Sequence, residues 1–295
     1  MARIAHREVL RPAELHALPG GKGVNAARAA VALGGRVITT GIAGGHTGRW
    51  MVETLAAEGL EPRFSYAAAE ARTAYVIVGD DGDSILVYER AAPATAEEYA
   101  VFLRLLGDEL LPISARAIVA GSIPGGLGPR DHATIVEVCR AAGVPLLVDA
   151  SGPGLTAALA ARPDLVKIGR VEAAETGVVG PGADALEAAV ALVEAGATTA
   201  VITDGADTVA AADASHTWQL RVPRIEVVNA VGSGDSFNAA VSLALMSGAD
   251  TPTALARGVA AGTANALTVS AASLDSAVAT ALEQDIEVVE RRRTA

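Results

Sequence analysis

Asn-Ala-Val-Gly-Ser-Gly-Asp-Ser-Phe-Asn, residues 229–238, follows a run typical of a strand and precedes a run typical of a helix. Gly232 and Gly234 allow the backbone to turn sharply, and the free amides at the start of the following helix attract an anion. Asp235 comes directly after this turn. A carboxylate there can accept a proton from an attacking hydroxyl while the amides stabilise a transferred phosphoryl group. The pattern fits equally an ordinary helix start, in which Asp235 only interacts with the helix dipole.

A second glycine-rich stretch lies near the start of the chain. Residues 19–25 read Pro-Gly-Gly-Lys-Gly-Val-Asn and lead into a helical run at 26–33. Three glycines, a lysine and a helix start again suit an anion. The stretch is not a P-loop, because Lys22 is followed by Gly23 where a Ser or Thr should hold Mg²⁺. Taken alone, it predicts no more than a turn that begins a helix.

Strand-like and helix-like segments alternate along the chain, which predicts a mainly parallel sheet with helices on both faces. The helical patterns include residues 130–142, 184–195 and 236–246. The strand-like segments are short, apolar and rich in β-branched residues, as buried strands are, and they lie at 36–43, 117–121, 144–149, 165–168 and 199–203, with a further strand expected at 221–228. We therefore expect one α/β domain over residues 1–295.

One segment departs from this alternation. Residues 73–79 and 84–89 are two β-type runs that flank Asp80-Asp81-Gly82-Asp83, and a glycine-containing turn between such runs predicts a hairpin. A hairpin inside an α/β chain suggests a small antiparallel flap on the main sheet.

Composition narrows the class of protein. Of 295 residues, 51% are hydrophobic and 19% charged, which is typical of a globular chain. The net charge of −11 argues against a nucleic-acid partner, which requires a basic surface. Cys139 is the only cysteine and the five histidines show no metal-ligand spacing, so neither a disulfide framework nor a histidine metal site is expected.

The chain begins without a signal-peptide pattern, and residues 258–274 are too polar and too short to span a membrane. We therefore expect a cytoplasmic protein with no membrane partner.

Together, the two glycine-rich stretches resemble the signature segments of the ribokinase/PfkB family of carbohydrate kinases. Residues 20–25 match the family's Gly-Gly-Lys-Gly-x-Asn, and residues 232–237 resemble its Gly-Ala-Gly-Asp-x-Phe, with Ser233 in place of alanine. Further matches follow in the family's order over nearly the whole chain: Arg72-Thr73, Gly121-Ser-Ile-Pro-Gly-Gly126, Asp149-Ala-Ser-Gly152, Thr203-Asp-Gly205 and Ala261-Gly-Thr-Ala-Asn265. Within the family, the chain resembles most the branch of 1-phosphofructokinase and tagatose-6-phosphate kinase.

The resemblance implies a ribokinase-like three-layer fold, with lid elements around residues 4–19 and 72–90. It implies ATP and Mg²⁺, with Asp235 as the catalytic base. The other implied site residues are Gly232, Ser233 and Gly234 in the anion hole; Gly21, Lys22, Asn25, Arg72 and Ser122 on the sugar side; Lys167, Thr203, Gly205 and Asn265 on the nucleotide side; and Glu172 for Mg²⁺ through water. Arg72 would grip the substrate's own phosphate, for which a guanidinium is suited. Without the family, Arg72 is a surface arginine, Ser122 a turn hydroxyl, and Thr203 and Asn265 local caps.

Three departures from the family pattern bear on the site and on the start of the chain. Gly169 stands where the family has an asparagine, in Lys167-Ile-Gly-Arg-Val-Glu172, and the flap adds a cation, Arg90. About 18 residues precede the first glycine corner, and they contain no core strand and no Asn-Pro-Ala-x-Asp segment with its sugar-binding aspartate. The chain as given is therefore expected to be a poor catalyst and marginally stable.

The resulting hypothesis is ATP-dependent phosphorylation of a hydroxyl on a sugar phosphate. Two alternatives stay open: a kinase for an unphosphorylated sugar or nucleoside, and a non-catalytic nucleotide- or sugar-phosphate-binding protein. Asp235 discriminates against the last of these, because a pure binder does not need a base. The expected partner is a small sugar or sugar phosphate, and a homodimer through the lid is left open together with the identity of the sugar.

Overall fold

The structure is a computed structural model that describes residues 12, 14–78, 84–90, 92–180 and 182–293. Its largest element is a seven-stranded sheet with the order β11-β10-β9-β8-β7-β6-β5. Neighbouring strands from β5 to β8 run parallel, whereas β9, β10 and β11 are added antiparallel. The strands are β5 (Ala117–Ala120), β6 (Leu146–Asp149), β7 (Leu165–Gly169), β8 (Thr199–Asp204), β9 (Thr208–Ala212), β10 (His216–Arg221) and β11 (Val288–Arg292).

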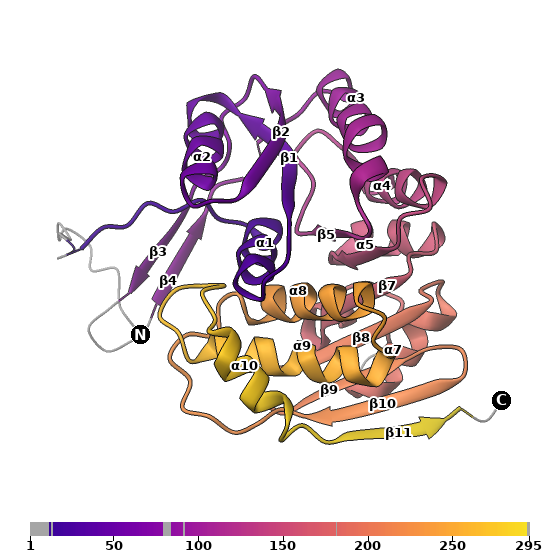
Figure 1. The fold of residues 1–295 in the computed structure, drawn as a ribbon. Coiled ribbons are helices and arrows are strands. Elements are labelled where there is room, and N and C mark those ends of the chain that lie inside the picture. Colours follow the sequence, from indigo (N-terminus) through magenta and orange to yellow (C-terminus); the bar gives the residue numbers. More distant parts are fainter. Residues whose placement is uncertain (1–11, 13, 79–83, 91, 181, 294–295) are drawn as a thin grey trace.

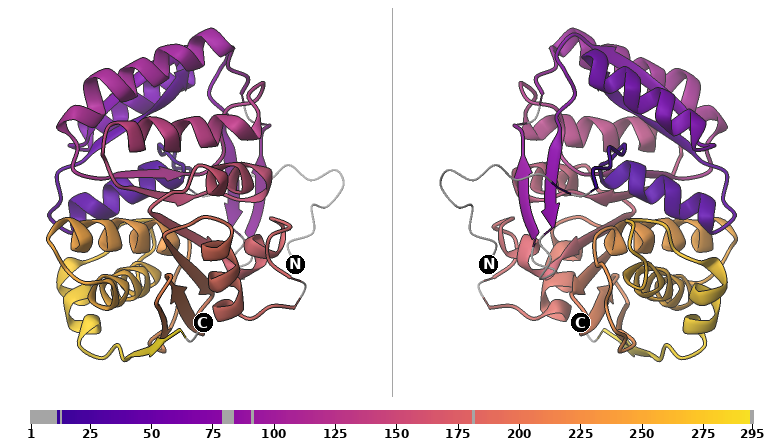
Figure 2. Two further views of the ribbon diagram at one scale, coloured as in Figure 1. Left: turned by 90° about the vertical axis from the view of Figure 1, so that its right-hand side faces the viewer. Right: turned by 90° about the vertical axis from the view of Figure 1, so that its left-hand side faces the viewer.

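Helices cover both faces of this sheet, as the alternation of segments predicts (Figures 1 and 2). One face carries α4 (Pro129–Ala141), α5 (Gly152–Ala160), the short α6 (Arg170–Ala174) and α7 (Ala185–Glu194). The other carries α8 (Ser233–Met246) and α9 (Thr251–Ala266), with α1 (Lys22–Ala32) and α10 (Ser276–Glu283) packed on them. Side chains alternate between the two cores: Leu147 packs toward α8 and α9, whereas Leu146 and Val148 pack toward α4 and α5.

Two smaller sheets lie beside the large one. β1 (Ile38–Gly44) pairs in parallel with β2 (Glu61–Ala67), and α2 (Gly45–Ala57) connects them. β3 (Ala74–Val78) and β4 (Ser84–Tyr88) form an antiparallel hairpin that projects from the body (Figures 1 and 2). α3 (Ala96–Arg104), a π-helical turn (Leu105–Leu110) and a 3₁₀ turn (Leu111–Ile113) then lead to β5.

The mixed α/β class with a mainly parallel sheet flanked by helices is confirmed. The hairpin matches the flap predicted over 72–90, although its turn, residues 79–83, lies outside the described residues. Most of the other lid segment, 4–11 and residue 13, also lies outside them. Within the described part of the chain, no helix combines the length and apolar character needed to cross a bilayer.

The strand predicted at 221–228 is wrong. β10 ends at Arg221, and the chain then passes through Pro223, which has no N–H to donate to a ladder. Val228 and Asn229 instead donate their backbone N–H groups to the carbonyl oxygen of Ala266, at the end of α9. The turn before α8 is therefore fixed by a helix end and not by a sheet.

Candidate active site

The candidate site lies where the carboxyl ends of β6 and β7 meet the amino-terminal ends of α1 and α8 (Figure 1). Leu147 and Leu165 are register partners that both pack toward α8. Side chains two residues apart on a strand share a face. Asp149 and Lys167 therefore point to the same side, at the edge where open α/β sheets bind ligands.

Asp235 lies in the first turn of α8 and is 6% exposed. The side-chain amide of Asn25, on α1, donates a hydrogen bond of 2.8 Å to its Oδ2. Burial raises the pKa of Asp235, because the charged form loses water. The charge of Asp149 acts in the same direction, while the Asn25 hydrogen bond, Lys167 and Lys22 oppose it. The structure thus holds a buried carboxylate that binds a proton more readily than an exposed aspartate.

The turn before Asp235 fits glycine for steric reasons. Gly232 has a φ of 86°, and a Cβ there would lie 2.9 Å from the backbone nitrogen of Ala272. A Cβ on Gly234 would lie 2.5 Å from Nζ of Lys167, so this ammonium group lies directly against the start of α8. A helix amino terminus and a lysine therefore meet at one point, which suits a phosphate.

Asn265 supports this turn from behind. Its Nδ2 donates to the carbonyl oxygen of Val231 at 2.9 Å and to Oγ of Ser233 at 3.1 Å, and its Oδ1 accepts from the backbone of Ala272 at 2.6 Å. The residue is 0% exposed. The structure thus shows a buried side chain that holds the glycine turn, and the nucleotide-side role that the resemblance implies for Asn265 stays a prediction.

Two lysines from different elements meet at Asp149, which is 1% exposed. Nζ of Lys22 lies 2.8 Å from Oδ1, and Nζ of Lys167 lies 3.1 Å from Oδ2. Burial on its own would raise the pKa of Asp149, but the two ammonium groups and the amide of Asn238 outweigh it and lower the pKa. Lys22 also lies 3.5 Å from Oε1 of Glu172, at the start of α6.

Some of the remaining predicted residues line the hollow beside Asp235, and others lie outside its lining. Gly21, Arg72 and Ser122 line the same hollow as Asp235, a space of about 3020 Å³. Arg72 is exposed, with its guanidinium carbon 6.0 Å from the centroid of the Tyr88 ring on the hairpin. Thr203 and Gly205 lie outside this lining, at the carboxyl end of β8, where Thr203 pairs with Gly169 of β7.

Comparison with known proteins decides the family. The sequence pattern described as "pfkB family carbohydrate kinase" matches residues 2–277. The chain is a PfkB family carbohydrate kinase. Its activity is therefore the ATP-dependent phosphorylation of a carbohydrate, and the family uses a divalent metal. The α/β arrangement described above is the ribokinase-like fold of this family.

Solved structures agree with this assignment. Phosphofructokinase-2 from Escherichia coli, in complex with potassium, is 27% identical, with a TM-score of 0.87 over 96% of this kinase and 93% of that chain. The same enzyme in complex with fructose-6-phosphate is 27% identical, with a TM-score of 0.83 over 96% and 92%. A Thermotoga maritima protein described as a possible 1-phosphofructokinase is 22% identical, with a TM-score of 0.84 over 97% and 93%, and supports the fold alone.

The carboxylates of the kinase suit a metal held mainly by nucleotide and water. Among the described residues, no three His, Cys, Asp or Glu side chains form a metal cluster. Mg²⁺ commonly takes one or two carboxylates and completes its shell with water and phosphate oxygens. Glu172 fits such a role, because its side chain is 41% exposed and its Oε1 lies 3.5 Å from Nζ of Lys22. Gly169 in the kinase donates its backbone N–H to Glu172 Oε2 at 3.3 Å.

Sequence reasoning missed two members of the site. The sequence pattern includes Asp149 only as part of a motif and gives Asn238 no role. In the structure, Nδ2 of Asn238 donates a hydrogen bond of 2.7 Å to Oδ2 of Asp149. A signal existed for Asp149: a charged residue that ends a continuously apolar strand lies at the ligand-binding edge of a parallel sheet. For Asn238 no sequence signal existed, because its partner lies 89 positions away.

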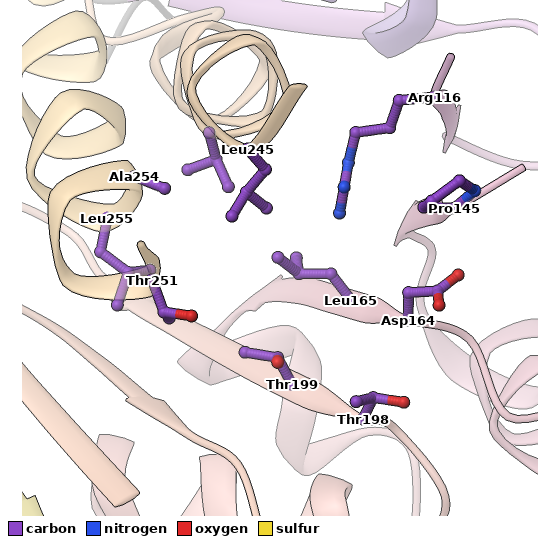
Figure 3. A pocket seen from close by; sticks show the side chains of 11 residues that line it. Arg116, Pro145, Asp164, Leu165, Thr198, Thr199, Leu245, Thr251, Ala254 and Leu255 are labelled. Carbon is purple, nitrogen blue, oxygen red and sulfur yellow. The ribbon is translucent and has the colours of Figure 1, made fainter. Parts of the chain in front are cut away.

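A second cavity, of about 230 Å³, lies at the opposite ends of the same parallel strands (Figure 3). Arg116 reaches into it, and Asp164, Leu165 and Thr199 line it. Asp164 accepts a hydrogen bond of 2.9 Å from the backbone of Leu146. Among the described residues, none of the predicted site residues lines this cavity, although Arg116 lines both it and the larger hollow.

Proposed function

We propose that this kinase transfers the γ-phosphoryl group of ATP to a hydroxyl of a sugar phosphate, of the kind that 1-phosphofructokinase and tagatose-6-phosphate kinase use. The observation that carries the proposal is the placement of Asp235, a buried carboxylate that directly follows the glycine turn and faces the same hollow as Arg72. The hollow thus offers a base, an anion-binding helix start and a guanidinium for a second phosphate.

In this proposal each group has one task. Asp235 accepts the proton of the attacking hydroxyl, and Asn25 holds the carboxylate in place through its 2.8 Å hydrogen bond. Gly232, Ser233 and Gly234 present backbone amides to the transferred phosphoryl group, and Lys167 adds a positive charge at the same point. Mg²⁺, when bound, neutralises charge on the ATP phosphates, and Glu172 is the carboxylate placed to hold its water.

The acceptor side is proposed to include Gly21, Lys22, Asn25, Arg72 and Ser122. Lys22 and Arg72 both line the hollow, and the exposed guanidinium of Arg72 suits a phosphate on the substrate better than an unphosphorylated sugar or nucleoside. Thr203 and Gly205 are proposed to contact the nucleotide from the end of β8. The sugar phosphate bound by E. coli phosphofructokinase-2, fructose-6-phosphate, is compatible with this arrangement.

The test is a panel assay of ADP release with ATP and Mg²⁺. We expect turnover with at least one of fructose 1-phosphate, fructose 6-phosphate and tagatose 6-phosphate, and much slower turnover with fructose or a nucleoside. The Asp235→Asn protein measures the background. A folded enzyme that turns over fructose or a nucleoside and none of the three phosphates would replace this proposal with the alternative kinase class.

The lid hairpin is also proposed to join two copies of the chain. Tyr75, Val76 and Tyr88 are 53%, 57% and 60% exposed, an unusual density of apolar surface for a two-stranded hairpin. A tetrameric form is known for E. coli phosphofructokinase-2. Light scattering on the purified chain should give at least a dimer, and Val76→Asp should yield a monomer; a monomeric wild type at micromolar concentration would refute the proposal.

A further inference from the structure

Asp149 is a buried carboxylate that contacts cations from two different elements. It ends β6, is 1% exposed, and receives Lys22, Lys167 and Asn238 at 2.8, 3.1 and 2.7 Å. The two lysines belong to different elements, because Lys22 opens α1 and Lys167 lies within β7. One buried anion thus connects two cations of different elements.

Both cations also face the place where phosphate is expected. Nζ of Lys167 would touch a Cβ on Gly234, and the charges of Lys22 and Lys167 both act on Asp235. Nζ of Lys22 lies between two carboxylates, 2.8 Å from Oδ1 of Asp149 and 3.5 Å from Oε1 of Glu172. A phosphate that enters the turn would compete with Asp149 for the N–H groups of these lysines.

We propose that Asp149 is a positioning residue that acts as an internal counter-anion, holding Lys22 and Lys167 at fixed places and competing with the phosphates of the ligand for them. This inference rests on the proposed function, because it takes the glycine turn as the phosphate site. Asp149 therefore weakens ground-state binding, and the same contacts set the geometry in which transfer occurs.

The charge of Asp149 also affects Asp235, the proposed base. Asp235 is faced by the charged groups of Asp149 on β6, Lys167 on β7 and Lys22 on α1, and by the neutral amide of Asn25. Removal of the Asp149 charge leaves two cations beside Asp235 with no buried anion opposite them. Asp235 then gives up its proton at lower pH and accepts the hydroxyl proton less readily.

The experiment compares wild type, Asp149→Asn and a matched control, Asp164→Asn. Asp164 directly precedes β7 and accepts a hydrogen bond from backbone, but it lies at the far cavity (Figure 3). Calorimetric titration with ATP in EDTA measures binding without turnover. We expect Asp149→Asn to bind ATP at least about 5-fold more tightly while kcat falls at least about 10-fold and the acid limb of kcat moves to lower pH. Asp164→Asn should keep the wild-type affinity.

Unchanged or weaker ATP binding by a folded Asp149→Asn protein overturns the inference. If Asp149→Asn does not fold, Lys167→Met is compared with Lys167→Met/Asp149→Asn, because removing both members of a buried ion pair is tolerated better than removing one. The double variant should then bind ATP more tightly than the single one, and equal affinity overturns the inference. Failure of the proposed function is distinct, since it would appear as wild-type binding of ATP without turnover of any sugar phosphate.

Discussion

Asp235 shows how one residue gains its chemistry from its surroundings. It is 6% exposed, it accepts a hydrogen bond from Asn25, and burial raises its pKa. A free aspartate would be a weak base at neutral pH, because its conjugate acid gives up its proton too easily. The raised pKa makes the carboxylate a better proton acceptor, and the hydrogen bond from Asn25 holds it in place.

Asp235→Asn should lower kcat by about 10²–10⁴-fold while ATP still binds, because loss of a general base typically costs that much. Steady-state kinetics with nucleotide titration measure both quantities. A near-normal kcat would leave Asp235 as a residue that only favours the helix dipole.

The pH dependence of kcat should show a limb from Asp235. Turnover requires the ionised carboxylate, and a raised pKa means that activity is lost at a higher pH, as pH falls, than an ordinary aspartate would allow. The Asn25 hydrogen bond lowers this pKa. Asn25→Ala should therefore move the acid limb to still higher pH. A limb that stays in place would show that Asp235 is not the titrating group.

Arg72→Ala should raise KM for the phosphorylated acceptor by about 10–100-fold, because a charge-assisted contact contributes about 1.5–3 kcal/mol. KM for ATP should not change. Arg130→Ala is the control, since its side chain is 85% exposed on α4. If the acceptor KM stays constant, Arg72 does not hold the substrate phosphate, and Arg90→Ala is the next variant to measure.

At the scale of the element, the start of α8 contains two glycines that are required for different reasons. Gly232 adopts a left-handed conformation against the backbone of Ala272, whereas Gly234 lies within the helix against the end of the Lys167 side chain. Backbone cannot move aside, but a lysine can rotate its terminal atoms. The first glycine is therefore required by the fold, and the second by the site.

Gly232→Ala should lower the free energy of unfolding by about 1–3 kcal/mol, from the left-handed strain and the contact with backbone. Gly234→Ala should leave stability unchanged or slightly higher, since Ala is preferred over Gly in a helix, but should lower kcat by displacing the ammonium of Lys167. Thermal unfolding and kinetics on both variants separate these effects. Equal loss of stability in both would contradict the assignment.

In the part of the chain that the structure describes, the strands of the molecule form three separate sheets. One edge of β1 pairs with β2, and the hollow between the sheets is lined by Ile38–Gly41 of β1 and by 117–120 of β5. Among the described residues, the buried hydroxyls of Thr39 and Thr40 have no hydrogen-bond partner. Unsatisfied buried groups cost about 1–3 kcal/mol each, against a total stability of about 5–15 kcal/mol. The described residues thus leave buried polar groups of β1 unsatisfied beside this hollow.

Marginal stability and weak turnover of the 295-residue chain stay predictions. Thermal unfolding and steady-state kinetics of the purified protein measure the two properties. A high melting temperature together with fast turnover would contradict both predictions.

The sequence by itself determined the alternation of strands and helices, the hairpin and the two glycine turns, because each depends on local periodicity and on residues that only a special backbone accepts. The local pattern predicted the wrong structure for residues 221–228. These residues resemble a strand, but Pro223 and the hydrogen bonds to the end of α9 prevent one. Only the tertiary structure decided that Asp149, Lys22 and Lys167 meet, since the first two are 127 positions apart. The same holds for Asn265, whose 0% exposure places it behind the turn. Burial and distant pairing give these residues their roles, and neither is contained in a short stretch of sequence.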